Sequence, residues 1–464
     1  MGGLLAPGAD VVPGSSPRAS LRRVALCAVS SLLTLVTLAV PRASAGPLLD
    51  KALAYSQNFQ DFHSPAYGCS VEVHFASPTD PTIVSYDDQG DSTIWTGNYL
   101  AGESYRYAVT HDPQAKAFGL RAVNCLLAME EVTGKPGFIA RWVGPAVPPF
   151  LFGGCDGDCH LVTDGPYAGT FWLGNTSSDQ YLGWWYGLSH AYDYLLDSPD
   201  DEPTRQRIGA AMGRVIDTLK NDGYQIVDPD GTVSTAGPDQ HGQKIMAYID
   251  ITSHVVGEPY TSMIDQIYSE NAFDYLFLTV YPITRWFQYY AFHLGYMAQH
   301  MLTKWEPNAF WESIDKQMLH DRLWTTTGNT QQVMFDYIDL AMGAIPLDAQ
   351  LVADDEAALA AFPDAPKRRI SPVQGPFTWD PFPQEMNQLV DFLNALFPTL
   401  GLPTFTNQAL DPFPVDQRCV SGFRWQSPPY EVCGGDDPSL EYPGEDYVIA
   451  YWLGRYHGYL SDAD

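Results

Sequence analysis

Residues 91–134, DSTIWTGNYLAGESYRYAVTHDPQAKAFGLRAVNCLLAMEEVTG, predict two consecutive helices in different surroundings. The first, 91–110, is apolar, aromatic or small almost all round, as is typical of a buried helix. The second, 112–134, is amphipathic and carries charged side chains on one face. Asp112 stands at its N-cap, Pro113 at its first position and Gly134 at its end. We therefore expect a buried helix followed by one that covers it.

The same alternation of buried and amphipathic helices continues along the chain. Further helices are predicted at 176–196, 201–223, 242–256, 259–279, 285–303, 308–323, 330–341, 353–361, 384–396 and 444–460. The section 362–444 is rich in Pro, Gly and aromatic residues, and only CSVEVHF, 69–75, alternates as a strand does. The pattern predicts an all-α fold in which helical hairpins form a closed ring, with long irregular Pro/Gly-rich segments.

The first 45 residues predict a secretory signal peptide. Arg22 and Arg23 precede the apolar run VALCAVSSLLTLVTLAV, and the small residues ASA-G at 43–46 indicate cleavage after about Ala45. The run is short for a membrane span. We expect an exported protein, secreted, periplasmic or at the cell surface, whose mature chain 46–464 is a single domain.

Charge and cysteine usage limit the possible partners. The chain has 55 acidic and 25 basic residues and a net charge of −30 at pH 7, which repels nucleic acid and anionic membranes. We expect neither as a partner. Export favours disulfides among the six cysteines outside the apolar run, with Cys155–Cys159 and Cys419–Cys433 as local pairs. A zinc site in CDGDCH is the alternative, but we predict no metal and no cofactor.

The segment WTGNYLAGESYRYAVTHDPQAKAFGLRAVNCLLAMEEVTGKPG, 95–137, resembles the first hairpin of the six-hairpin glycosidase-like (α/α)6 toroids. The resemblance extends from about 91 to 325 and returns at EDYVIAYWLGRYHGYL, 445–460. Such rings include glycoside hydrolases, unsaturated-uronyl hydrolases, epimerases and lyases. The resemblance implies a carbohydrate substrate, most simply a glycoside hydrolase.

In such a ring the buried helices begin at one end, where free backbone N–H groups and side chains of the first turn meet. Glycoside hydrolysis needs two carboxyl groups, and the helix starts offer Asp91, Asp179, Glu445 and Asp446 as catalytic candidates. The candidates for substrate binding, by stacking or hydrogen bonding, are Trp95, Trp184, Trp185, His241, Gln243, Arg285, Trp286 and Tyr289.

Each candidate also has a structural interpretation. Asp179 closes a TSSD capping box if Thr176 is the N-cap, and Glu445 and Asp446 favour a helix N-terminus electrostatically. The aromatic residues suit a core. A polysaccharide lyase on the same fold is a rival function, with a base and a uronate-neutralising group drawn from Tyr181, His241, Arg285 and Asn329. The second rival is a non-catalytic binding or structural protein.

Overall fold

The computed structural model describes residues 46–151, 154–155, 157–278, 285–286, 288–382, 387–396 and 406–464, and gives no side chains for 387–391. The predicted signal peptide lies outside the described residues. None of the described helices is long and apolar enough to cross a membrane.

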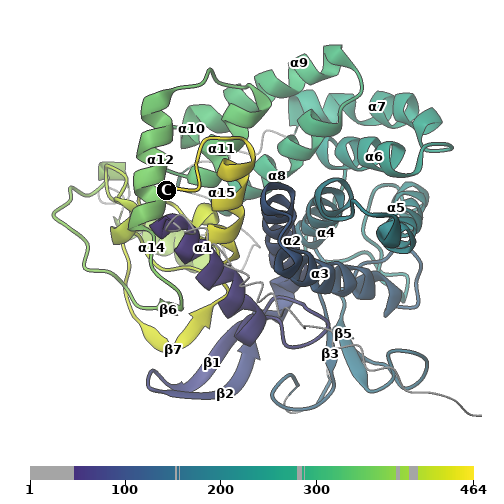
Figure 1. Ribbon diagram of the computed structural model, residues 1–464, viewed down its shortest axis with the longest axis horizontal. Helices are drawn as coiled ribbons and strands as arrows, with labels where there is room; N and C mark the ends of the chain where they lie inside the picture. Colours follow the sequence, from purple (N-terminus) through teal and green to yellow (C-terminus); the bar gives the residue numbers. More distant parts are fainter. Residues whose placement is uncertain are drawn as a thin grey trace, which may run out of the picture. The chain divides into compact units, whose positions relative to one another are not determined.

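Helices make up most of the described structure, as Figure 1 shows. They are α1 (Pro47–Asn58), α2 (Ser92–Thr110), α3 (Pro113–Glu131), α4 (Ser178–His190), α5 (Glu202–Asn221), α6 (Gln243–Val256), α7 (Ile264–Phe273), α8 (Tyr290–Trp305), α9 (Ala309–Met318), α10 (Thr325–Thr327), α11 (Val333–Met342), α12 (Ala349–Ala361), α14 (Asn387–Leu396) and α15 (Glu445–Tyr456). The capping residues act as the sequence predicts at α3, where the Asp112 side chain accepts a hydrogen bond from the Gln114 backbone N–H.

The prediction of an all-α toroid is wrong, because the fold also contains two antiparallel sheets. Of the residues that the structure describes, 55% are helical and 11% are in strands, an α+β mixture. One sheet has the order β2-β1-β7-β6 and the other β3-β5-β4. The strands are β1 (Glu72–Ser77), β2 (Asp80–Asp87), β3 (Trp142–Pro145), β4 (Cys159–Leu161), β5 (Thr170–Leu173), β6 (Lys367–Arg369) and β7 (Asp437–Tyr442).

Most of these strands were not predicted from the sequence, and the reason is physical. Four of the described strands, β3, β4, β5 and β6, have only three or four residues, and several strands lie in segments rich in Pro and Gly, where alternation cannot be read over enough residues. Paired strands can also be far apart in the sequence, since Val73 of β1 lies opposite Glu441 of β7. The exception is the CSVEVHF segment, whose alternation predicted β1: Val73 and Phe75 are buried while Glu72 and His74 are partly exposed.

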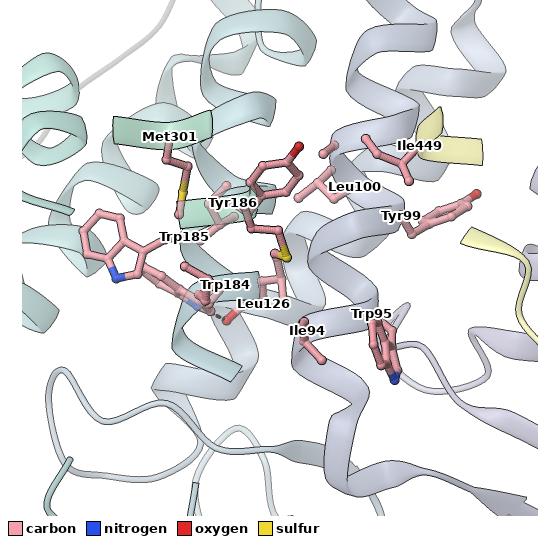
Figure 2. Close-up of a cluster of buried hydrophobic side chains, with 14 of the residues drawn as sticks. Ile94, Trp95, Tyr99, Leu100, Leu126, Trp184, Trp185, Tyr186, Met301 and Ile449 are labelled. Atoms are coloured by element: carbon pink, nitrogen blue, oxygen red, sulfur yellow. Dashed lines mark hydrogen bonds between the residues drawn. The ribbon is translucent and has the colours of Figure 1, made fainter. Parts of the chain in front are cut away.

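The buried helices are in contact with one another through their apolar and small residues. α2 packs against α4 and α15, α6 and α11 both pack against α8, and α11 also contacts α15. α2 and α4 approach so closely that a Cβ on Gly97 would lie 1.9 Å from the Gly183 carbonyl oxygen. Figure 2 shows side chains from α2, α3, α4, α8 and α15 meeting in this core.

The six cysteines within the described residues are paired, as the export hypothesis predicts. Cys69–Cys125 joins the segment before β1 to α3, and Cys155–Cys159 and Cys419–Cys433 close short loops. The alternative zinc site in CDGDCH is therefore wrong, because both of its thiols are consumed in a disulfide.

Candidate functional site

A polar cavity of about 750 Å³ lies between the β1–β2–α2 region and the segment 419–435. Its walls are Glu72, Asp88, Asp91, Trp95, Arg369, Ser371, Cys419, Val420, Ser421, Gly422, Gln426, Ser427, Glu431, Val432, Cys433, Gly434, Gly435 and Tyr442. The size is that of a small-molecule site. Four carboxyl side chains and one indole give it an acidic and partly aromatic lining.

Glu72 is the first residue of β1, and the alternation of the strand turns its side chain away from buried Val71 and Val73. Burial, with a contribution from Asp88, raises the pKa of Glu72 from its usual value of 4.5 to about 8. A Cβ on Gly422 would lie only 2.9 Å from the Glu72 Oε1 atom. Because residue 422 is glycine, the Glu72 carboxyl has room at this position. Because its pKa is about 8, Glu72 is protonated at neutral pH.

Asp88 follows β2 with a left-handed backbone, φ 56°, which aspartate tolerates better than most residues. The Trp95 Nε1–H donates a hydrogen bond of 2.8 Å to Asp88 Oδ2. Burial and the neighbouring Asp91 raise the pKa of Asp88 to about 7. The hydrogen bond thus links Trp95, near the start of α2, to the carboxyls Glu72, Asp88 and Asp91 of the cavity.

Asp91 precedes the first residue of α2, and 46% of its side chain is exposed. It makes no capping hydrogen bond. Gln180 Nε2 donates to its Oδ1 atom at 2.9 Å, and Arg141 Nη1 lies 3.5 Å away. Burial raises the pKa of Asp91, while Arg141 and the Gln180 hydrogen bond act in the opposite direction. Its position lets it contact both water and the cavity.

Trp95 and Tyr442 are the aromatic residues of the lining, and Trp95 is buried, with 5% exposed. Its indole stacks on Phe423 with ring centroids 5.0 Å apart and planes inclined by 12°. In Figure 2 it lies at the lower edge of the labelled cluster, with its ring nitrogen directed away from the other side chains. The structure brings Asp91 and Trp95, both predicted from the sequence, into one cavity.

Asp179 lies near this cavity but is not one of its lining residues. It is the second residue of α4, Ser177 is the N-cap, and no side chain caps the helix. The TSSD capping box is therefore wrong: Thr176 is one residue too early, and its buried hydroxyl has no partner among the described residues. Burial and Asp91 raise the pKa of Asp179 to about 6, against the lowering effects of Lys244 and Arg141.

Glu445 and Asp446 begin α15 and are buried. Asp446 Oδ2 accepts hydrogen bonds from Lys367 Nζ at 2.6 Å and from the Arg424 backbone N–H at 2.7 Å. The oxygens of Glu445 have no hydrogen-bond partner in the described part of the chain. Burial, followed by Asp446, raises the pKa of Glu445 far above its usual value. Neither residue lines the cavity, and Asp446 anchors the helix start.

Trp184 and Trp185 lie in the core, which leaves no face for a substrate. Both are fully buried. Trp184 Nε1 donates to the Leu126 carbonyl at 2.8 Å, a bond drawn in Figure 2, and Trp185 stacks on Tyr248. The all-round apolar character of α4 therefore reflects packing.

The remaining predicted binding residues lie outside the cavity lining. His241 Nδ1 contacts Asp239 Oδ1 at 2.6 Å, and Gln243 is the first residue of α6. Arg285 forms an ion pair with Asp380, which also accepts a hydrogen bond from the Trp286 indole. Tyr289 is buried and accepts a hydrogen bond from Gln332. The structure does not bring this set together with Asp91.

Of the lyase candidates, His241 and Arg285 have the partners described above. The Tyr181 hydroxyl is buried and accepts a hydrogen bond from the Ile139 backbone N–H at 3.3 Å. Asn329 is exposed and lines a different cavity. None of these four lines the acidic cavity.

Sequence reasoning missed Glu72, Asp88 and Glu431. The CSVEVHF alternation marked Glu72 as the polar face of a strand, so that residue could have been found. Asp88 lies in DDQGD, which contains two other acidic residues, and no local pattern distinguishes Asp88 from them. Glu431 belongs to the irregular section 406–435, whose pairing with other segments no local pattern shows.

Within the described ranges no group of three or more His, Cys, Asp or Glu residues is arranged to hold a metal ion. Comparison with family models, curated proteins and solved structures finds no match to this chain. The likeness to six-hairpin glycosidases thus stays a prediction.

Proposed function

We propose that this chain hydrolyses glycosidic bonds in the acidic cavity, with Glu72 as the proton donor and Asp91 as the base. The observation that carries the proposal is the contrast between the two carboxyls in one cavity. Burial raises the pKa of Glu72 to about 8, whereas the effect of burial on Asp91 is countered by the Arg141 guanidinium 3.5 Å away and by the Gln180 hydrogen bond. Hydrolysis of a glycoside needs this division of labour between two carboxyl groups.

In the proposed reaction, the Glu72 carboxyl protonates the glycosidic oxygen as the bond to the anomeric carbon breaks. Asp91 takes a proton from a water molecule, whose oxygen forms the new bond to that carbon. Glu72 ends ionised and Asp91 protonated, and exchange with solvent restores both. Gln180 and Arg141 hold the Asp91 carboxyl and favour its charged form before the reaction.

Asp88 and Trp95 have supporting roles in this proposal. The hydrogen bond between them fixes the indole at the wall of the cavity. The indole is itself buried, with 5% of Trp95 exposed, and it stacks on Phe423, so its role is to hold the Asp88 carboxyl in place. Asp88 also raises the pKa of Glu72, because two nearby carboxyls resist double ionisation.

The test is a screen of neutral, amino and uronate glycans for released reducing ends, with absorbance of unsaturated uronates measured in parallel. We expect reducing ends without unsaturated products. Glu72→Gln and Asp91→Asn should each lower kcat by about 10² or more. Asp164→Asn, at an exposed carboxyl outside the cavity, is the matched control. Unsaturated products would favour the lyase, and no turnover of any glycan would contradict the proposal.

The disulfides and the absence of a membrane-spanning helix among the described residues are compatible with a secreted protein. We further propose that residues 1–45 are the signal peptide, removed after about Ala45. N-terminal sequencing of the exported protein would test this, and a mature chain that still carries Arg22 and Arg23 would contradict it.

A further inference from the structure

We propose that the buried carboxyls of Asp336 and Asp355 form a pH-sensitive contact between α11 and α12, which keeps α12 closed in acidic and neutral solution and lets it open in alkaline solution. The inference goes beyond the hydrolase proposal and does not depend on it, because its test measures the opening of a helix and needs no substrate.

The contact joins two neighbouring helices through a shared proton. Asp336 lies on α11 and Asp355 on α12, and both side chains are wholly buried. No N–H or O–H group of another described residue bonds to any of their four oxygen atoms. The two carboxyls instead hydrogen-bond to each other. Two ionised carboxylates have no proton to donate, so this hydrogen bond exists only while the pair holds a proton.

The cation nearest to the pair does not replace this proton. Arg418 is buried and lowers the pKa of Asp336, against the larger effect of burial. Its guanidinium, however, donates hydrogen bonds to the backbone carbonyls of Thr330, Gln331 and Phe413. Because none of its N–H groups bonds to either aspartate, Arg418 leaves the pair without a donor.

The other titratable and charged groups around the pair supply no donor either. Those on the same two helices are Tyr337, Asp339, Asp354 and Glu356, and those on the elements packed against them are Tyr296 of α8, Tyr447 of α15, Lys51 of α1 and Arg424. The charged residues of 319–324 and 415–417 are exposed or partly exposed. Tyr296 donates to Asp339 at 2.7 Å, and Lys51 donates to the Ala360 carbonyl at the end of α12.

The sign of the pH effect follows from burial. Burial raises the pKa of Asp336 to about 7, and burial followed by the charge of Asp336 raises the pKa of Asp355. When α12 separates from α11, both carboxyls are in water and ionise near their ordinary pKa of 3.8. The closed state therefore keeps a proton that the open state loses. Its stabilisation is complete below about pH 4 and falls as the pH rises through the folded-state pKa values.

The position of α12 gives its opening a path to the acidic cavity. Asp355 and Arg418 line a separate hollow of about 360 Å³, so the pair lies beside a space that water can fill. α12 also packs on the turn Val415–Gln417, which leads through Arg418 to Cys419 in the wall of the acidic cavity. Opening of α12 therefore loosens one end of that wall.

The experiment is hydrogen–deuterium exchange of the whole chain from pH 6.5 to 8.5, measured by mass spectrometry on peptides of α12 and corrected for the intrinsic exchange rate. We expect the opening constant of α12 in the wild-type protein to rise about 10-fold per pH unit, the effect of one proton released on opening. Asp355→Asn should remove this slope, because the asparagine N–H group donates to Asp336 at every pH. Asp354→Asn, at the exposed neighbouring position on the same helix, is the matched control and should keep the slope.

Two further variants make the result specific to this pair. Asp336→Asn is the reciprocal change, so it should also remove the slope, and it serves as the test if Asp355→Asn does not fold. Glu72→Gln should keep the slope, which separates the pair from the carboxyls of the acidic cavity. An opening constant of α12 that does not vary with pH in the wild-type protein would overturn the inference, as would a slope that Asp355→Asn and Asp336→Asn both retain.

Discussion

Glu72 and Gly422 show how single residues shape the candidate site. The carboxyl of Glu72 lies where a side chain at position 422 would begin, with 2.9 Å between the Oε1 atom and a Cβ built there. The sequence marked Glu72 only as a polar position in an alternating run. The part played by Gly422 follows from a contact between residues far apart in the chain, so no local pattern could indicate it.

We predict that Gly422→Ala displaces the Glu72 carboxyl. Glycan turnover should fall by roughly 10-fold or more, because a shift of about 1 Å misaligns a proton donor. The melting temperature should change little, since the carboxyl can move into the cavity. Steady-state kinetics and thermal melting on the same sample check this, and unchanged kcat/KM would show that the position of Glu72 is unimportant.

Asp179 illustrates a residue whose surroundings the sequence indicated only in part. Asp179 lies in the first turn of α4 and near Asp91, but it makes no capping hydrogen bond. We predict that Asp179→Asn costs less than about 1 kcal/mol of unfolding free energy. Because the Asp91 charge raises the pKa of Asp179, Asp91→Asn should lower the pKa of Asp179 below about 6, and NMR titration of the Asp179 carboxyl measures this. An Asp179 pKa that stays in place would mean that the two carboxyls do not interact.

At the scale of elements, long helices were predictable and short strands were not. The segments 91–110 and 112–134 correspond to α2 and α3 because their periodicity spans several turns and their ends carry caps. The three residues of β6 and the six of β7 offer no comparable signal. These strands depend on pairing with β1 and with each other, which builds the wall beside the cavity.

The contact between α2 and α4 depends on glycine. We predict that Gly97→Ala lowers the free energy of unfolding by about 1–3 kcal/mol, the usual cost of overpacking. Gly209→Ala on α5, where the nearest side-chain atom would be 3.3 Å from the new Cβ, is the control and should cost less. Chemical denaturation of both variants measures the difference. Equal stabilities would show that α2 and α4 separate without cost.

At the scale of the whole molecule, two sets of titrating groups act in opposite directions on stability. Carboxyls with raised pKa values, such as Glu72 at about 8 and Asp315 at about 7, favour the folded state when protonated. Their contribution is complete at low pH and is lost as the pH rises through the folded-state pKa. Buried His190 and half-buried His457 have pKa values lowered to about 3 and about 4, so their contribution is lost as the pH falls.

These signs predict maximum stability in mildly acidic solution, at about pH 5–6, with losses toward pH 8 and toward pH 3. Glu72→Gln should reduce the loss on the alkaline side, since the glutamine cannot ionise. Melting temperatures measured from pH 3 to 9 for both proteins check this. A wild-type maximum above pH 8 would contradict the burial of these carboxyls.

The central claim is that Glu72 donates the proton to the leaving group in glycoside hydrolysis, and the most direct measurement compares Glu72→Gln on two substrates. Fluoride leaves a glycosyl fluoride without needing a proton, whereas a sugar leaving group needs one. We predict that Glu72→Gln lowers kcat on the glycan by about 10² or more and retains most of the wild-type rate on the matching fluoride. Asp91→Asn should be impaired on both. Equal losses on the two substrates in Glu72→Gln, or no loss on the glycan, would contradict the claim.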